Sequence, residues 1–192
     1  MVVGVEKKIV YFNEPGPQNT DETLRLAKER ADELGIKTIV VASSTGETGV
    51  KASEIFKGYN LIVVSHVAWF KGPNVEEFSS ENREKILRNG GKIVTATHAF
   101  GGIGRAIRRK FNTMQIDEVI ANVLRLFGQG MKVACEIACM AVDSGYVKPG
   151  EEIISIAGTG RGADTAIVIK AANTHDFFET KILEIICKPL KT

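Results

Sequence analysis

Short runs of β-branched residues alternate along the chain with stretches in which apolar residues recur at helical spacing. The runs are continuous, as in Thr38-Ile39-Val40-Val41-Ala42, which is typical of strands buried on both faces of a parallel sheet. This order of elements predicts a sheet covered by helices. The expected strands are residues 8–12, 38–42, 61–64, 92–95, 153–157 and 165–169, with 181–187 as a last, edge strand.

The amphipathic stretches predict the helices. The stretch 20–34 should be capped by Asn19, with Glu22 as reciprocal partner, and should end at Gly35. Residues 131–144 are apolar nearly all round and predict a buried helix. Further helices are expected at 50–56, from Ser80 as N-cap to Gly90-Gly91, at 105–110 and at 116–127.

The loops that follow the strands are the places to look for a ligand site. Parallel strands bring their carboxyl ends to one edge of a sheet, and ligands of open α/β sheets bind at that edge. We therefore expect a site among the loops 13–19, 43–49, 65–74, 97–105 and 158–164.

The loop Ser43-Ser44-Thr45-Gly46-Glu47-Thr48-Gly49 has the composition of a phosphate site. It joins a strand to a helix and holds four hydroxyls and two glycines. A phosphate requires converging N–H and O–H donors, and glycines allow the backbone to form an anion-holding turn at a helix N-terminus. The alternative is a plain helix cap in which Ser44 and Glu47 form a capping box. The loop lacks the G-x-x-x-x-G-K pattern of nucleoside triphosphate sites.

Two further glycine-rich loops are candidates for the same edge. The first, 98–105, matches a dinucleotide loop only loosely, and the second, 157–165, precedes a strand instead of a helix. The first either approaches a ligand, with Arg105 as charge partner, or is a simple connector. The second predicts either a lid or wall over the ligand or a mobile surface loop. Candidate ligand-binding residues here are His98, Gly101, Gly102, Arg105, Gly158, Thr159, Gly160, Arg161, Gly162 and Thr165.

Several side chains suit catalysis, but none forms a sharp catalytic motif. His66 and His98 each follow a strand and suit a general base, or are simply polar residues at strand ends. Their spacing matches no common zinc signature, so no metal site is expected. Cys135 and Cys139 lie four residues apart on the apolar helix and predict buried small side chains instead of a redox pair.

Composition limits the class of protein. The 192 residues are 44% hydrophobic and carry a formal net charge of +2, which fits one globular domain over residues 1–192 and argues against nucleic-acid or membrane partners. No apolar run approaches the ~20 residues of a membrane span, no signal peptide is recognisable, and three cysteines suit a reducing compartment, so we expect a soluble cytoplasmic protein. The basic run 105–110 is interpreted as a solvated helix face. Homo-oligomerisation is a hypothesis, with the helix 131–144 and the pair Trp69-Phe70 as candidate surfaces; Trp69 and Phe70 also suit stacking on a planar ring.

Three segments resemble the C-terminal α/β domain of pyruvate kinase: 37–46, 143–153 and 156–166. The resemblance covers roughly residues 20–170. It implies a three-layer α/β/α sandwich with a mostly parallel sheet and an antiparallel C-terminal strand. In pyruvate kinase this domain holds a sugar-phosphate effector. The kinase's catalytic barrel has no counterpart here, so pyruvate kinase activity is not expected.

The chain is more closely similar to a stand-alone archaeal group of such domains, which adds an N-terminal strand at Ile9–Phe12. This resemblance implies flavin mononucleotide (FMN) as ligand, with its phosphate on Ser43, Ser44, Thr45, Gly46, Thr48 and Gly49. One hypothesis is therefore an FMN-binding protein, extending to a flavin-dependent oxidoreductase of unknown substrate. The other is a non-catalytic module that senses a sugar phosphate or nucleotide.

Overall fold

The computed structural model describes residues 4–191. Its strands are β1 Val10–Phe12, β2 Thr38–Ala42, β3 Asn60–Val64, β4 Lys92–Val94, β5 Glu152–Ala157, β6 Thr165–Lys170 and β7 Lys181–Pro189. Its helices are α1 Thr20–Leu34, α2 Glu47–Ile55, α3 Ser80–Arg88, α4 Ile103–Phe111, α5 Ile116–Arg125 and α6 Gln129–Asp143, with short 3-10 turns η1 Pro17–Asn19 and η2 Thr174–Glu179. The strands form one sheet in the order β1-β7-β6-β5-β2-β3-β4.

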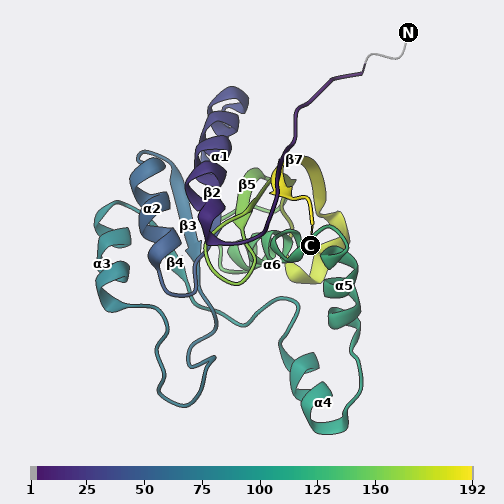
Figure 1. Ribbon diagram of the computed structural model, residues 1–192. Coiled ribbons are helices and arrows are strands. Elements are labelled where there is room, and N and C mark those ends of the chain that lie inside the picture. Colours follow the sequence, from purple (N-terminus) through teal and green to yellow (C-terminus); the bar gives the residue numbers. More distant parts are fainter. Residues whose placement is uncertain (1–3, 192) are drawn as a thin grey trace.

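The sheet is the middle of three layers (Figure 1). Because side chains alternate along a strand, Ile39 and Val41 of β2 pack into one core with α1, α2 and α3, while Val40 packs into the other with α5 and α6. Both faces are covered, which is why the strands read as continuous apolar runs. The expected three-layer, mostly parallel sheet is confirmed. The antiparallel strand is β6, which runs opposite to both of its neighbours.

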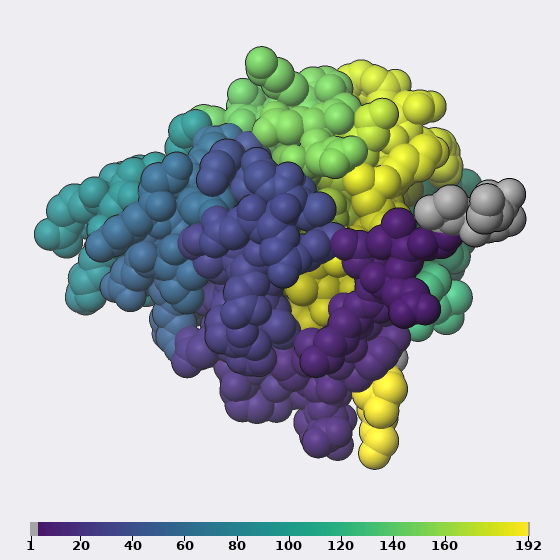
Figure 2. All heavy atoms as spheres, turned by 90° about the horizontal axis from the view of Figure 1, so that it is seen from above, coloured from purple at the N-terminus to yellow at the C-terminus, as the bar shows by residue number. Residues whose placement is uncertain are grey.

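The N-terminal strand changes the edge of the sheet. β1 pairs in parallel with β7 from Val10 opposite Cys187 to Phe12 opposite Pro189. The space-filling view shows this N-terminal segment (purple) beside the C-terminal strand (yellow) (Figure 2). The added strand is therefore confirmed. The prediction that 181–187 forms the edge is wrong, because β1 pairs with the last residues of β7 and takes the edge position itself.

Two predicted helix caps differ from the structure. The turn η1 holds Asn19 in a helical conformation, so its amide donates back to the Glu14 carbonyl (2.8 Å) instead of capping α1. Glu22 pairs with Arg25. The helix end at Gly35 is confirmed, since Gly35 adopts the left-handed conformation.

The cap of α3 lies one residue before the predicted one. Ser79 is extended, and its hydroxyl accepts the N–H of Asn82 at 3.2 Å. An extended backbone allows a side chain to reach over the first turn, whereas Ser80 is already helical. The two serines are adjacent and chemically equal, so only the backbone conformation distinguishes them.

The central helix α6 is buried along almost its whole length, as expected. Burial raises the pKa of the Cys135 and Cys139 thiols to about 12, so neither is a thiolate at neutral pH. Because α6 is covered by the sheet and by α5, it offers no surface for self-association. Among residues 4–191, no helix combines the length and apolar character needed to cross a bilayer.

Candidate ligand-binding site at the carboxyl edge of the sheet

A cavity of about 260 Å³ opens where β2 and β5 end side by side. The chain leaving β2 continues towards β3, and the chain leaving β5 continues towards β6 on the opposite side. This divergence is the switch point at which α/β sheets bind ligands. Four of the five predicted loops contribute to the cavity; loop 13–19 does not line it. The lining residues used below are Ser43, Ser44, Thr45, Glu47, Thr48, His66, Phe70, His98, Arg105, Arg125, Gln129, Lys132, Glu136, Gly158, Gly160, Arg161 and Gly162.

The hydroxyl-rich loop supplies one wall of the cavity. Helix α2 begins at Glu47, so the second half of the predicted loop is its first turn. Gly46 is the N-cap at φ 94°, and Ser43 Oγ accepts the N–H of Gly49 at 3.1 Å. Among the described residues, the N–H groups of Gly46 and Thr48 have no acceptor. The capping box of Ser44 with Glu47 is not formed, because the cap position belongs to a glycine without a side chain.

The second glycine loop is a fixed wall, because Asp164 anchors it. This carboxylate is completely buried. One of its oxygens accepts N–H groups of Gly16 and Thr159, both at 3.1 Å, and the other accepts the Thr165 hydroxyl at 2.8 Å. These bonds join the loop after β5 to the loop before α1. Of the alternatives that the sequence left open, these bonds favour the wall over the lid and the mobile surface loop.

Some predicted ligand residues lie behind the cavity wall instead of on it. A side chain at Gly49 would meet Ile86 and Val63 at 2.8 Å, which places its free face against the core. Thr165 turns towards Asp164. The residues that are not among the cavity lining are Gly46, Gly49, Gly101, Gly102, Thr159 and Thr165.

Aromatic and imidazole rings form another part of the cavity lining. Phe70 lies with its ring centroid 4.6 Å from that of His66 and 5.0 Å from that of His98. The Arg105 guanidinium lies 5.2 Å from the Phe70 centroid, a cation–π arrangement. Glu77 Oε2 lies 2.9 Å from His66 Nδ1 and orients that ring. Trp69, by contrast, is largely exposed.

The protonation of His98 follows from its surroundings. Burial lowers the pKa of His98 to about 4, and the charges of His66, Arg105 and Lys132 act in the same direction against the opposing Glu136. Its Nε2 lies 3.4 Å from the Val67 nitrogen as acceptor, which assigns the proton of the neutral ring to Nδ1. At neutral pH this side chain is thus a neutral donor and acceptor.

We expect His98 to make the protein less stable as the pH falls from about 6.5 to about 4. The folded pKa lies below the ordinary value of 6.5, so in this window the unfolded chain binds the extra proton and unfolding is favoured. Urea unfolding at a series of pH values should show a smaller loss for His98→Gln than for the natural protein. His175→Gln, at an exposed position, is the control; equal pH slopes in all three proteins would contradict the assignment.

A buried ion pair at the floor of the cavity was missed by the sequence reasoning. Lys132 Nζ contacts Glu136 Oε2, and both residues are only 5% exposed. Glu136 Oε1 accepts the N–H of Phe100 at 3.0 Å. Burial lowers the pKa of Lys132, opposed by Glu136. The available signal was a lysine and a glutamate four residues apart in an otherwise apolar helix.

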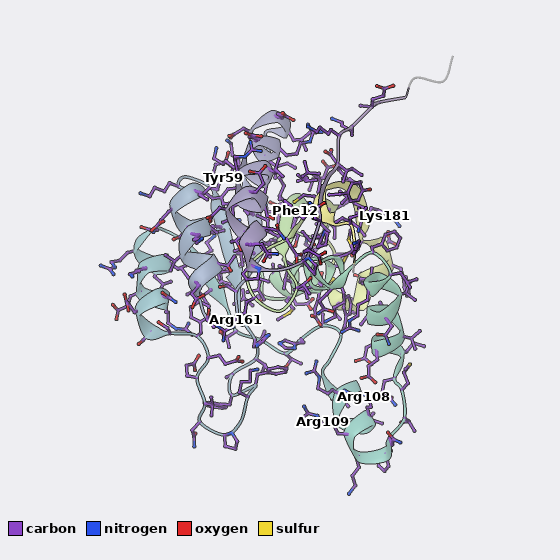
Figure 3. All side chains as sticks on the ribbon, in the orientation of Figure 1. Phe12, Tyr59, Arg108, Arg109, Arg161 and Lys181 are labelled. Atoms are coloured by element: carbon purple, nitrogen blue, oxygen red, sulfur yellow. The ribbon has the colours of Figure 1, made fainter. Side chains whose placement is uncertain are left out.

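The charges around the cavity favour an anion. Lys132 and Glu136 neutralise one another, which leaves Arg105, Arg125 and Arg161 against the exposed Glu47. Arg161 lies at the carboxyl edge of the sheet in Figure 3. Within residues 4–191, no three His, Cys, Asp or Glu side chains are placed to hold a metal ion together.

Comparison with known proteins matches most of the chain, from α1 to β6. Similar solved structures include a pyruvate kinase from Cryptosporidium parvum (15% identity, TM-score 0.41, 79% of this chain and 22% of that chain). Another is the C. parvum pyruvate kinase in complex with ADP (16% identity, TM-score 0.37, 78% and 22%). The chain thus spans about a fifth of the pyruvate kinases it matches. A profile of the pyruvate kinase alpha/beta domain matches residues 21–169, and the chain therefore belongs to that domain family.

Proposed function

We propose that this protein binds a phosphorylated ligand at the carboxyl edge of its sheet, and that the ligand is FMN. The observation that carries the proposal is the cavity itself, which brings the unpaired helix N–H of Thr48, hydroxyls and arginines together with a wall of rings. Its volume of about 260 Å³ suits a small ligand that extends partly out of the cavity.

The hydroxyl wall supports a phosphate. The unpaired N–H group of Thr48 lies at the start of α2, where the helix dipole favours negative charge. The hydroxyls of Ser43, Ser44, Thr45 and Thr48 line the same side of the cavity, and Arg161 adds positive charge. Glu47 opposes this arrangement, but its side chain lies at the exposed rim.

The ring wall supports a planar, aromatic group. Phe70, His66 and His98 offer ring faces, and Arg105 is held beside Phe70. This combination of a phosphate wall and a ring wall fits FMN better than a sugar phosphate, which has no planar ring to stack. We propose with it that the chain groups with stand-alone domains of this family that carry FMN.

Bound FMN would supply hydride and electron transfer, and the protein would bind and orient it. Within this chain, the neutral His98 can hold a proton at Nδ1, and Lys132 can donate a hydrogen bond from the cavity floor. The rigid loop 158–162 would exclude water from one side. We infer an oxidoreductase role from these features, with the substrate left unassigned.

The proposal predicts that the purified protein binds FMN more tightly than riboflavin, which lacks the phosphate. Flavin fluorescence quenching should give at least a tenfold difference in Kd, because charge-assisted hydrogen bonds contribute about 1.5–3 kcal/mol each. Thr48→Val should weaken FMN binding about tenfold or more and leave riboflavin binding unchanged. Thr180→Val, which also removes a buried hydroxyl but lies outside the cavity, is the matched control.

The FMN proposal is contradicted by a colourless protein that does not quench the fluorescence of added FMN. Binding of other phosphates then decides what remains of the proposed site. If glucose 6-phosphate or AMP then raises the melting temperature, the cavity belongs to a non-catalytic sensing module; at 100 times Kd such a ligand adds about 2.7 kcal/mol. If neither flavin nor these phosphates bind, the phosphate site itself is wrong.

A further inference from the structure

Helices α4 and α5 form a hairpin at the margin of the fold. In Figure 1 α4 projects beyond the body of the protein, whereas α5 packs on α6; α4 has no buried residue. Its nine residues contact α5 but contribute nothing to either core. A helix this short is marginal in water without a covered apolar face. The hairpin is therefore incomplete as an isolated structure.

The apolar residues of the hairpin face outwards. On α4, Ile103, Ile107 and Phe111 recur every four residues on one side. On α5, the inner side packs on the core through Ile120 and Leu124. The large apolar side chains of the hairpin that are at least 44% exposed are Ile103, Phe111, Met114, Ile116, Val119, Val123, Leu126 and Phe127.

This outward face is too large for an ordinary monomer surface. At roughly 150 Å² for one fully exposed large apolar side chain, the low end of the aromatic range, the exposed fractions of these eight residues sum to the order of 800 Å². The largest apolar patch on a monomeric protein is about 300–600 Å². Each partner in a specific protein interface buries about 800 Å². The area therefore matches one half of a protein–protein interface.

Three of the hairpin's cations are engaged within the protomer, whereas Arg109 and Lys110 of α4 make no ion pair with another described residue. Arg105 lies over Phe70, Arg108 pairs with Glu118, and Arg125 bonds to Asn122 and Gln129. Arg108 and Arg109 project from α4 in Figure 3. At helical spacing Arg105 and Arg109 lie away from the stripe of Ile103, Ile107 and Phe111, while Lys110 lies beside Ile103 and Ile107 at the edge of the apolar face.

We propose that the outward face of α4 and α5 is the interface at which two copies of this chain associate. A two-fold axis would bring the same apolar face from each copy together as a four-helix arrangement. Because α4 carries Arg105 and α5 carries Arg125, the association also fixes two cationic residues of the cavity in place. The earlier candidate pair Trp69-Phe70 lies outside this interface.

The test is the mass of the full-length protein in solution, measured without any ligand by light scattering after size-exclusion chromatography. We expect twice the chain mass of 20.9 kDa at micromolar concentration. Leu126→Asp and Ile116→Asp should each shift the mass to that of one chain and raise the dimer Kd at least 100-fold. Circular dichroism of both variants checks that the monomer remains folded.

The matched control is Leu87→Asp, which changes an exposed leucine of α3, away from the hairpin. It should leave the dimer intact. A natural protein that is monomeric at 100 µM, or a dimer unaffected by Leu126→Asp, would overturn the proposal. Sedimentation with phosphatidylserine vesicles, lost in Leu126→Asp, would assign the face to a membrane instead. None of these measurements depends on FMN, so the proposed dimer and the proposed FMN binding are tested independently of each other.

Discussion

Glu136→Ala is expected to lower the free energy of unfolding by about 3–5 kcal/mol, because it leaves a buried ammonium group without its partner. Lys132 is 5% exposed and pairs with Glu136. The variant also removes the acceptor of the Phe100 N–H. Urea unfolding at pH 7 measures the loss. Burial already lowers the pKa of Lys132, so the deficit should shrink as the pH rises towards 10.5, where the unfolded chain also loses the proton.

Two controls separate burial from charge pairing. Glu81→Ala breaks an exposed pair with Lys85 at the same spacing and should leave the unfolding curve nearly unchanged. The double variant Lys132→Met/Glu136→Leu should recover most of the lost stability, since an apolar pair of similar volume removes both charges. If Glu136→Ala is as harmless as Glu81→Ala, the pair is hydrated and the described cavity floor is wrong.

Gly162→Ala is expected to cost about 2–4 kcal/mol, from backbone strain together with overpacking. Gly162 has φ +72°, and a Cβ there would lie 2.5 Å from Pro17 Cα and 2.9 Å from Pro17 Cβ. The clash is with backbone of the loop before α1, which cannot move without breaking the bonds of Asp164. Thermal and urea unfolding measure the loss.

Gly160→Ala is the matched control for this change. Gly160 lies in the same loop at φ +77°, but nothing lies within 4 Å of the added Cβ. Its cost should therefore be the left-handed backbone alone, about 1–2 kcal/mol. Similar losses for Gly160→Ala and Gly162→Ala would show that the loop is not anchored against residues 13–19.

The layered fold could be predicted because it rests on local patterns. Buried strands read as continuous apolar runs, and α1 and α6 read as helical stripes, so element type and order followed from the sequence. The predicted helix caps were wrong where the backbone conformation decides whether a suitable side chain can cap. Asn19 is held in a helical conformation by η1 and does not cap α1. Ser79 is extended and caps α3 in place of Ser80.

The candidate site was predicted in part. Serines, threonines and glycines after a strand indicate a ligand edge without any knowledge of packing. Whether a given glycine faces the cavity or the core depends on its neighbours, as Gly49 against Ile86 shows. The Lys132–Glu136 pair was hidden inside a helix that was interpreted as apolar. Asp164 is identified as an anchor only by the groups that donate hydrogen bonds to it, which belong to Gly16, Thr159 and Thr165.

The sequence by itself determined a parallel sheet covered by helices and the edge where a ligand would bind, because these follow from periodicity and from the direction of the chain; the three-layer arrangement was implied by the family resemblance. Only the tertiary structure decided which side chains meet. It brought His66, Phe70 and His98 together from separate loops, made the loop after β5 rigid, and left the apolar face of α4 and α5 uncovered. Burial, charge pairing and exposure depend on contacts between residues far apart in the chain, so no local pattern could supply them.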